Sequence, residues 1–158
     1  MKMKIYIIGI GLIGGSFAME MRKLFPKSKI IGIDKSENNL NKAYELGLID
    51  KKSCLSKISD ADIIIVSVPV KSIINLLPNI LDKVNKNTLV IDFGSTKNSI
   101  CNVIKDHPNR ENFLATHPIA GTEFSGPKAA HKGLFANKNI IICDKHRTNQ
   151  SRLEIALK

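Results

Sequence analysis

The sequence KIYIIGIGLIGG, residues 4–15, decides the fold. Its first part, Lys4–Ile8, is rich in β-branched residues and ends at a glycine, which is typical of a strand followed by a turn. Over Leu12–Leu24 the apolar residues recur at helical spacing. This stretch therefore predicts a strand, a tight turn and a helix in direct succession.

The turn between that strand and helix contains the pattern Gly-x-Gly-x-x-Gly. In such a loop the first glycine permits the tight turn, the second lets a pyrophosphate approach the backbone, and the third allows close packing of helix on strand. The helix N-terminus adds unpaired N–H groups that favour a negative ligand. We therefore expect a dinucleotide here, against the alternative of a merely flexible glycine turn. The expected contacts are Gly9, Gly11, Leu12, Ile13 and Gly14.

A carboxylate ends the next predicted strand, at Asp34, 20 residues beyond Gly14. At this place an acidic side chain accepts hydrogen bonds from the adenosine ribose and repels the 2′-phosphate of NADP. The sequence therefore favours NAD as the cofactor. Two alternatives stay open. Asp34 is also suited to cap the following turn, and the neighbouring Lys35, which we include among the expected cofactor contacts, could tolerate an extra phosphate.

Strand-like and helix-like segments alternate along the remaining chain. Asp62–Val68 is a nearly unbroken apolar run, as expected for a central parallel strand that is covered on both faces. Further strands are predicted at residues 29–34, 88–93, 113–116 and 139–143, and helices at 36–46, 70–84, 95–105 and from 151 onward. Pro78 is expected to kink or divide the third helix. The alternation predicts an α/β fold, a doubly wound and mostly parallel sheet of the Rossmann type, in one dinucleotide-binding domain over residues 1–158.

Two polar side chains follow neighbouring predicted strands and are the best candidates for chemistry. Ser95 follows the strand at 88–93, and His117 follows the strand at 113–116. Since ligands of open α/β sheets bind beyond the carboxyl ends of the strands, both are expected near the nicotinamide end of the cofactor, together with Val68. A histidine there can polarise or deprotonate a substrate hydroxyl while hydride leaves the same carbon. The alternatives are a structural histidine and a serine that only caps the next helix.

Other polar residues receive weaker expectations. Glu123 lies in the irregular stretch 117–138, whose length is typical of a functional loop. It is expected to order that loop or bind a cationic partner residue, or else to be a solvated surface residue. Lys97 either faces an anionic substrate or occupies the first turn of its helix. Three histidines in polar stretches are expected at the surface, namely His107, His131 and His146.

The composition argues against several classes of protein, although nucleic-acid binding driven by the net charge stays open as an alternative. The 158 residues carry 24 Lys+Arg against 14 Asp+Glu, a net charge of +10, but the lysines are spread along the chain and aromatic residues make up only 5%, without Trp. We therefore expect no nucleic-acid partner. No apolar run approaches the ~20 residues of a membrane span, so we expect a cytoplasmic protein without a membrane partner. Cys54, Cys101 and Cys143 form no metal-binding pattern, and we expect reduced, buried cysteines and no metal site.

Four segments together resemble the prephenate dehydrogenase family, with its close relative arogenate dehydrogenase. They are IIGIGLIGGS, DIIIVSVPV, DFGSTKNSI and especially ATHPIAGTEFSGPKAA, which begin at residues 7, 62, 92 and 115. The resemblance covers nearly the whole chain. It implies NAD-dependent oxidative decarboxylation of prephenate to 4-hydroxyphenylpyruvate in tyrosine biosynthesis, or the corresponding reaction of arogenate. It also implies that His117 contacts the ring hydroxyl and promotes hydride transfer, that Ser95 supports it, and that Glu123 organises the entrance of the active site.

The resemblance extends to the last residues of the sequence. Family members continue into an all-helical domain that dimerises and supplies cationic residues for the substrate carboxylates, whereas this sequence stops at Lys158. We therefore expect the chain to lack that domain, to form a homodimer only together with it, and to be incomplete as an enzyme. A non-catalytic dinucleotide-binding or regulatory module is the alternative from a different class.

Overall fold

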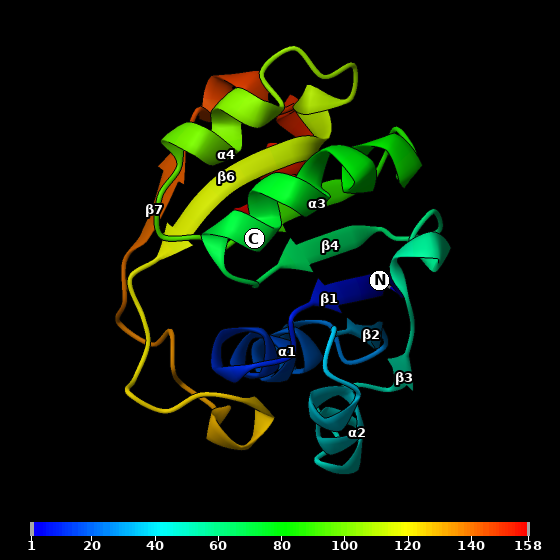
Figure 1. The fold of residues 1–158 in the computed structure, drawn as a ribbon, viewed down its shortest axis with the longest axis vertical. Helices are drawn as coiled ribbons and strands as arrows, with labels where there is room; N and C mark the ends of the chain where they lie inside the picture. Colours follow the sequence, from blue (N-terminus) through cyan, green and yellow to red (C-terminus); the bar gives the residue numbers. More distant parts are fainter. Residues whose placement is uncertain (1, 158) are drawn as a thin grey trace.

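A twisted seven-stranded sheet forms the centre of the structure, a computed structural model that describes residues 2–157 (Figure 1). The strands lie side by side in the order β3-β2-β1-β4-β5-β6-β7. All neighbours are parallel except β6 and β7, which are antiparallel. The strands are β1 (Lys4–Ile8), β2 (Lys29–Ile33), β3 (Lys51–Lys52), β4 (Ile63–Val66), β5 (Leu89–Asp92), β6 (Phe113–Pro118) and β7 (Ile140–Cys143).

The sheet winds in two directions from β1. The chain first adds β2 and β3 on one side of β1, and then returns to place β4, β5 and β6 on the other side. Between β1 and β4 the direction in which strands are added therefore reverses. In such sheets this position, the switch point, is where a crevice opens beyond the carboxyl ends of the strands. The predicted doubly wound, mostly parallel sheet is confirmed.

Helices cover both faces of the sheet. They are α1 (Leu12–Leu24), α2 (Glu37–Glu45), α3 (Val70–Lys83), α4 (Asn98–Val103) and α5 (Gln150–Ala156), with short 3-10 turns η1 (Leu55–Lys57), η2 (Arg110–Asn112), η3 (Pro127–Ala129) and η4 (Lys145–Arg147). Successive side chains of a strand point to opposite faces, so Ile64 and Val66 pack with α3 and α4, whereas Ile63 and Ile65 pack on the face of α1, α2 and α5. In Figure 1, α3 and α4 lie in front of the sheet.

The glycine turn after β1 is as tight as the sequence predicts. Gly9 has a φ of +92°, in the region that favours glycine, and a side chain on it would lie 2.6 Å from the Ser67 carbonyl oxygen. A Cβ on Gly14 would lie 2.1 Å from the carbonyl oxygen of Gly9, so only glycine lets α1 approach the turn this closely. Gly11, the N-cap of α1, differs because a Cβ there would meet nothing within 4 Å.

Several boundaries differ from the prediction. The strand predicted at 113–116 extends to Pro118, because β7 pairs with it on its outer side. Helix α3 continues through Pro78 without division, since its buried face (Ile73, Leu77, Ile80 and Leu81) is held against the core. The helix predicted at 95–105 is only Asn98–Val103. The strand β3 was not predicted, because two exposed lysines carry no apolar pattern.

Two side-chain expectations were wrong. Cys54 is exposed, next to η1, whereas Cys101 is buried in the core as expected. His107 is not a surface residue, since its side chain is 11% exposed and its Nε2 lies 3.2 Å from the Asp82 carboxylate at the end of α3. The error at His107 arises from a contact between segments that are distant in the sequence. Across residues 2–157, no helix combines the length and the apolar character that crossing a membrane requires.

The glycine turn generates the first test. Gly14→Ala is expected to lower the free energy of unfolding by about 3 kcal/mol, because the added methyl group forces α1 away from the turn. The matched variant Gly11→Ala adds the same methyl group in open space and is expected to cost less than about 1 kcal/mol, through its effect on the N-cap. Urea unfolding of both variants measures the difference, and equal losses would contradict this description of the turn.

Candidate functional site

A cavity of about 270 Å³ opens at the carboxyl ends of β4, β5 and β6. The cavity extends from Ile13, in the first turn of α1, to the ends of these strands. Four residues predicted from the sequence line it, namely Ile13, Val68, Ser95 and His117. The other lining residues are Ser67, Pro69, Val70, Phe93, Gly94, Pro118 and Ala120. The fold therefore brings the two candidate catalytic side chains and two of the expected cofactor contacts to one place.

The glycine loop forms the second part of the site, on the other side of the switch point. Asp34 accepts hydrogen bonds from the Ile10 N–H and from the Ser36 N–H, both at 2.9 Å. The capping function left open by the sequence is thus present, and the same carboxylate also fixes the loop itself. Lys35 is exposed beside it. The open space at Gly11 is the kind of cradle that a pyrophosphate needs at a helix N-terminus.

His117 lies on β6, opposite Ile141 of the antiparallel strand β7. Its side chain is half-buried, and its Nδ1 atom is buried without a hydrogen-bond partner. A buried polar atom without a partner is unusual and marks a candidate functional group. The imidazole therefore combines contact with the cavity and a nitrogen that no protein group engages.

Ser95 lies in the loop between β5 and α4 and is exposed toward the cavity. It does not cap α4, because the N-cap of that helix is Lys97 and has no capping side-chain hydrogen bond. The helix starts later than predicted since the Lys97 side chain turns inward to the buried Asp92 carboxylate. The serine is therefore available to a ligand, and the alternative of a capping serine is wrong.

Sequence reasoning gave no role to Asp92, which is fully buried at the end of β5. Its carboxylate forms an ion pair with Lys97 and accepts hydrogen bonds from the N–H groups of Gly94, at 3.0 Å, and Thr116, at 3.2 Å. Burial raises the pKa of the Asp92 carboxyl, and the Lys97 ammonium opposes that shift. The expectation that Lys97 faces an anionic substrate fails, because its side chain is 11% exposed and already paired.

Residues 119–139 form a strap that leaves β6, passes beside α1 and α2, and returns to β7 (Figure 1). Backbone N–H groups of His131 and Gly133 donate to Ser16 and Glu20 of α1, both at 3.0 Å. The rings of Phe17, Phe93 and Phe135 also pack together, with centroids 4.9–6.2 Å apart. The strap thus connects the His117 end of the site to the helix of the glycine loop.

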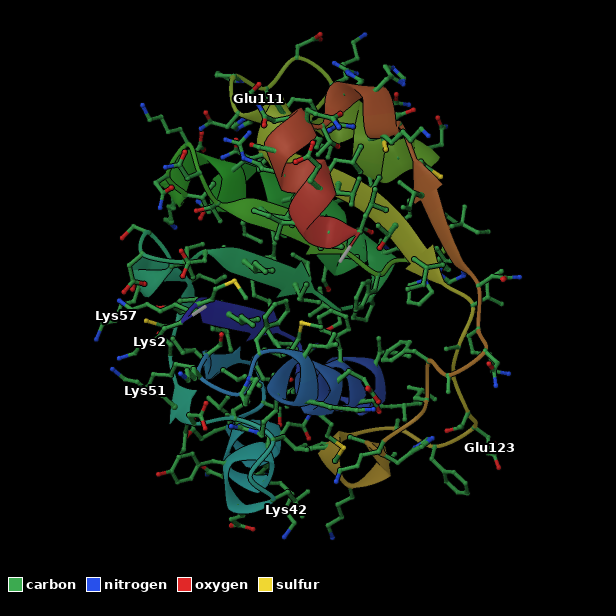
Figure 2. All side chains as sticks on the ribbon, turned by 180° about the vertical axis from the view of Figure 1, so that it is seen from behind. Lys2, Lys42, Lys51, Lys57, Glu111 and Glu123 are labelled. Carbon is green, nitrogen blue, oxygen red and sulfur yellow. The ribbon has the colours of Figure 1, made fainter. Side chains whose placement is uncertain are left out.

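Glu123 lies on this strap, exposed, and is not among the residues that line the cavity. Figure 2 shows its side chain at the outer edge of the molecule, projecting away from the sheet. The structure therefore does not bring Glu123 together with Ser95 and His117. Within residues 2–157, no group of three or more His, Cys, Asp and Glu side chains has the arrangement of a metal site.

A larger, mainly apolar hollow of about 880 Å³ lies between α1 and residues 132–140. None of the site residues predicted from the sequence lines it. We assign the candidate site to the smaller cavity. Unlike the larger hollow, it lies near the switch point, borders the helix of the glycine loop and is lined by polar side chains at strand ends.

The fold and this site define a Rossmann-type nucleotide-binding domain of the dehydrogenase class. Residues 17–158 match the family model described as prephenate dehydrogenase, nucleotide-binding domain. The chain therefore belongs to the prephenate dehydrogenase family. The match begins after the glycine loop, so the loop itself is a separate observation that agrees with it.

Individual relatives support this assignment. The chain is 34% identical over 158 residues to a prephenate dehydrogenase of Bacillus subtilis strain 168, covering 98% of this chain and 43% of that protein. A crystal structure of prephenate dehydrogenase from Aquifex aeolicus, in complex with hydroxyphenyl propionate and NAD⁺, matches with a TM-score of 0.86 and 30% identity, over 98% of this chain and 55% of that one. The arogenate dehydrogenase of Synechocystis matches with a TM-score of 0.84 and 28% identity, again over 98% and 55%. The chain thus spans about half the length of these relatives.

The Ser95 loop generates the second test. Ser95→Ala is expected to change the free energy of unfolding by less than about 0.5 kcal/mol, because the side chain is exposed and caps nothing. Thr116→Val is expected to cost about 1–2 kcal/mol, because the buried hydroxyl donates to the Asp92 carbonyl oxygen at 2.7 Å. Chemical unfolding compares the two, and a loss at Ser95 as large as that at Thr116 would restore a structural role for the serine.

Proposed function

We propose that this chain is the NAD-binding part of a prephenate dehydrogenase, which converts prephenate to 4-hydroxyphenylpyruvate and carbon dioxide in tyrosine biosynthesis. The observation that carries the proposal is the placement of His117 and Ser95 in one cavity at the strand ends, beside the glycine loop, in a chain of this family. A biosynthetic reaction on soluble acids also supports a cytoplasmic location.

The residues around the switch point fit a dinucleotide. The open backbone at Gly11 and the N-terminus of α1 would hold the pyrophosphate. Asp34 would accept hydrogen bonds from the adenosine ribose with the lone pairs that its two backbone bonds leave free. Ile13, Val68 and Ser95 would contact the nicotinamide end, which supplies the hydride acceptor when NAD is bound. Lys35, exposed next to Asp34, would contact the adenosine end of the cofactor.

His117 would act on the hydroxyl of the substrate ring. As hydride leaves the carbon that bears this hydroxyl, the imidazole accepts the hydroxyl proton, so a carbonyl forms in the ring. Loss of carbon dioxide from the opposite ring carbon then restores aromaticity, and the proton returns to the phenolic oxygen. The proton therefore balances over the cycle, and one residue serves as base and then as acid. Ser95 would hydrogen-bond the same hydroxyl or the imidazole.

The remaining functions of the complete protein lie outside the cavity. Lys97 is not free to bind the carboxylates of the substrate. We assign carboxylate binding and homodimer formation to the all-helical domain that the family resemblance places after this span, and to Glu123 a role at the entrance between the two parts. Lys2, Lys51 and Lys57 lie where the parallel strands begin, opposite the cavity (Figure 2). Aromatic residues make up only 5% of the chain, so we propose no nucleic-acid partner.

Arogenate is the second candidate substrate. The similarity to the Synechocystis arogenate dehydrogenase, at a TM-score of 0.84, is nearly as strong as that to the Aquifex prephenate dehydrogenase. Arogenate differs by carrying an amino acid side chain in place of the pyruvyl group, far from the ring hydroxyl. The same His117 chemistry therefore serves both, and comparing the kcat/KM of the complete protein on the two compounds decides between them.

The cofactor assignment gives the third test. Isothermal titration calorimetry of the chain is expected to show tighter binding of NAD than of NADP, since the Asp34 carboxylate repels a 2′-phosphate. Asp34→Ala is expected to lower the ratio of NAD affinity to NADP affinity at least tenfold. Lys57→Ala, at an exposed lysine in η1 away from the glycine loop, is expected to leave this ratio unchanged. Equal binding of NAD and NADP by the unmodified chain would contradict the assignment.

The assignment of His117 gives the fourth test. In the complete protein, His117→Asn is expected to lower kcat by ~10²–10⁴-fold, the usual contribution of a general acid–base group. Its affinity for NAD is expected to stay within threefold, because the imidazole acts only while hydride leaves. His131→Asn, at an exposed position on the strap, serves as the control. A loss of less than tenfold would remove His117 from the mechanism.

A further inference from the structure

Three polar groups of Thr116 are bound by the buried pair of Asp92 and Lys97. The Thr116 N–H donates to Asp92 Oδ1 at 3.2 Å, and the Thr116 hydroxyl donates to the Asp92 carbonyl oxygen at 2.7 Å. Lys97 Nζ donates both to Asp92 Oδ2 and, at 2.7 Å, to the Thr116 carbonyl oxygen. Thr116 directly precedes His117, so these contacts fix the backbone from which the imidazole projects.

The contacts begin where the ladder between β5 and β6 stops. The last paired residues of the two strands are Asp92 and Ala115. Beyond them the end of β6 pairs only with β7 among the described strands, and β7 is an edge strand whose Ile140 and Ile141 are about half exposed. The side chains of Asp92 and Lys97 thus replace main-chain pairing at the point where β6 enters the cavity.

The same pair also closes the loop that carries Ser95. Asp92 Oδ2 accepts from the Gly94 N–H at 3.0 Å, and the Lys97 ammonium returns to the same carboxylate. Ser95 lies between these two attachment points. A single ion pair therefore sets the relative position of the two candidate catalytic side chains, one on each of two neighbouring strands.

We propose that Asp92 and Lys97 are positioning residues of this site, which hold His117 and Ser95 in a common geometry toward the cavity. This proposal rests on the proposed function of His117 and Ser95, and it adds two residues to which that function assigns no role. Neither member of the pair lines the cavity, so neither contacts the reacting atoms. Because Asp92 is fully buried, loss of the Lys97 charge leaves an uncompensated carboxylate that must take up a proton or water.

The first experiment uses the chain itself. In Lys97→Met, the Thr116 amide hydrogen is expected to exchange at least tenfold faster than it does in the unmodified chain. The exchange rate of the Ile65 amide, in the buried strand β4, is expected to change less than threefold. The NMR signals of the His117 ring, identified by their loss in His117→Asn, are expected to broaden or split. Lys97→Arg is expected to restore a single set of signals, and Lys105→Met, at an exposed lysine, is expected to leave them unchanged.

Should Lys97→Met fail to fold, the double variant Asp92→Asn/Lys97→Met removes the buried charge and keeps the test. This double variant is expected to fold, because no unpaired carboxylate remains. Its His117 ring signals are still expected to be broadened or split. Unchanged exchange at Thr116 and unchanged His117 signals in either folded variant would overturn the proposal.

The second experiment uses the complete protein with prephenate. Lys97→Met is expected to lower kcat at least tenfold with the KM for NAD within threefold, and Lys97→Arg is expected to recover most of it. A raised KM for prephenate with unchanged kcat would make Lys97 a substrate-binding cation and would overturn the proposal. If instead His117→Asn retains full turnover, the proposed function itself fails, so the two failures are distinguishable.

Discussion

The close approach of α1 to the turn after β1 is the constraint on which the site depends. A Cβ at position 14 would lie 2.1 Å from the Gly9 carbonyl oxygen, so no larger residue fits. Because the helix starts directly at this turn, its first N–H groups face the carboxyl edge of the sheet, next to the end of β4. The Ser67 hydroxyl, which donates to the Gly9 carbonyl oxygen at 2.9 Å, joins the turn to the strand beside it. Dinucleotide binding and the cavity thus share one rigid boundary.

Parallel pairing then collects the remaining groups. The carboxyl ends of β4, β5 and β6 lie at one edge, so residues from positions 67 to 120 meet there without any local relation in the sequence. The strap returns from β6 to α1 through Ser16 and Glu20 and joins the two halves of the winding. The His117 end of the site is therefore connected to α1, the helix of the glycine loop. In the proposed function, this arrangement would let one domain orient a substrate hydroxyl against a nicotinamide ring.

The parts of the fold with local signals were predictable from the sequence. The glycine pattern marks its own turn, the apolar run at 62–68 marks a covered strand, and their order dictates a parallel sheet whose carboxyl edge receives Ser95 and His117. Several of the errors share a cause. The pairing of Asp92 with Thr116 spans 24 positions and that of His107 with Asp82 spans 25, and neither leaves a periodicity that a sequence shows. Lys97 adds a further case, because its ammonium donates to the Thr116 carbonyl oxygen, 19 positions away, as well as to the nearby Asp92, and is thereby removed from solvent.

The central claim is that a single dinucleotide spans the edge from the glycine loop to the His117 cavity. Amide and imidazole NMR signals of the chain, titrated with NAD and separately with ADP-ribose, which lacks the nicotinamide, test it most directly. Both ligands should move the signals of Ile10 and Gly11, but only NAD should move those of Gly94, Ser95 and His117. If ADP-ribose moves the signals of Gly94, Ser95 and His117 as NAD does, the claim is contradicted. NAD binding that leaves these three signals unchanged would also contradict it.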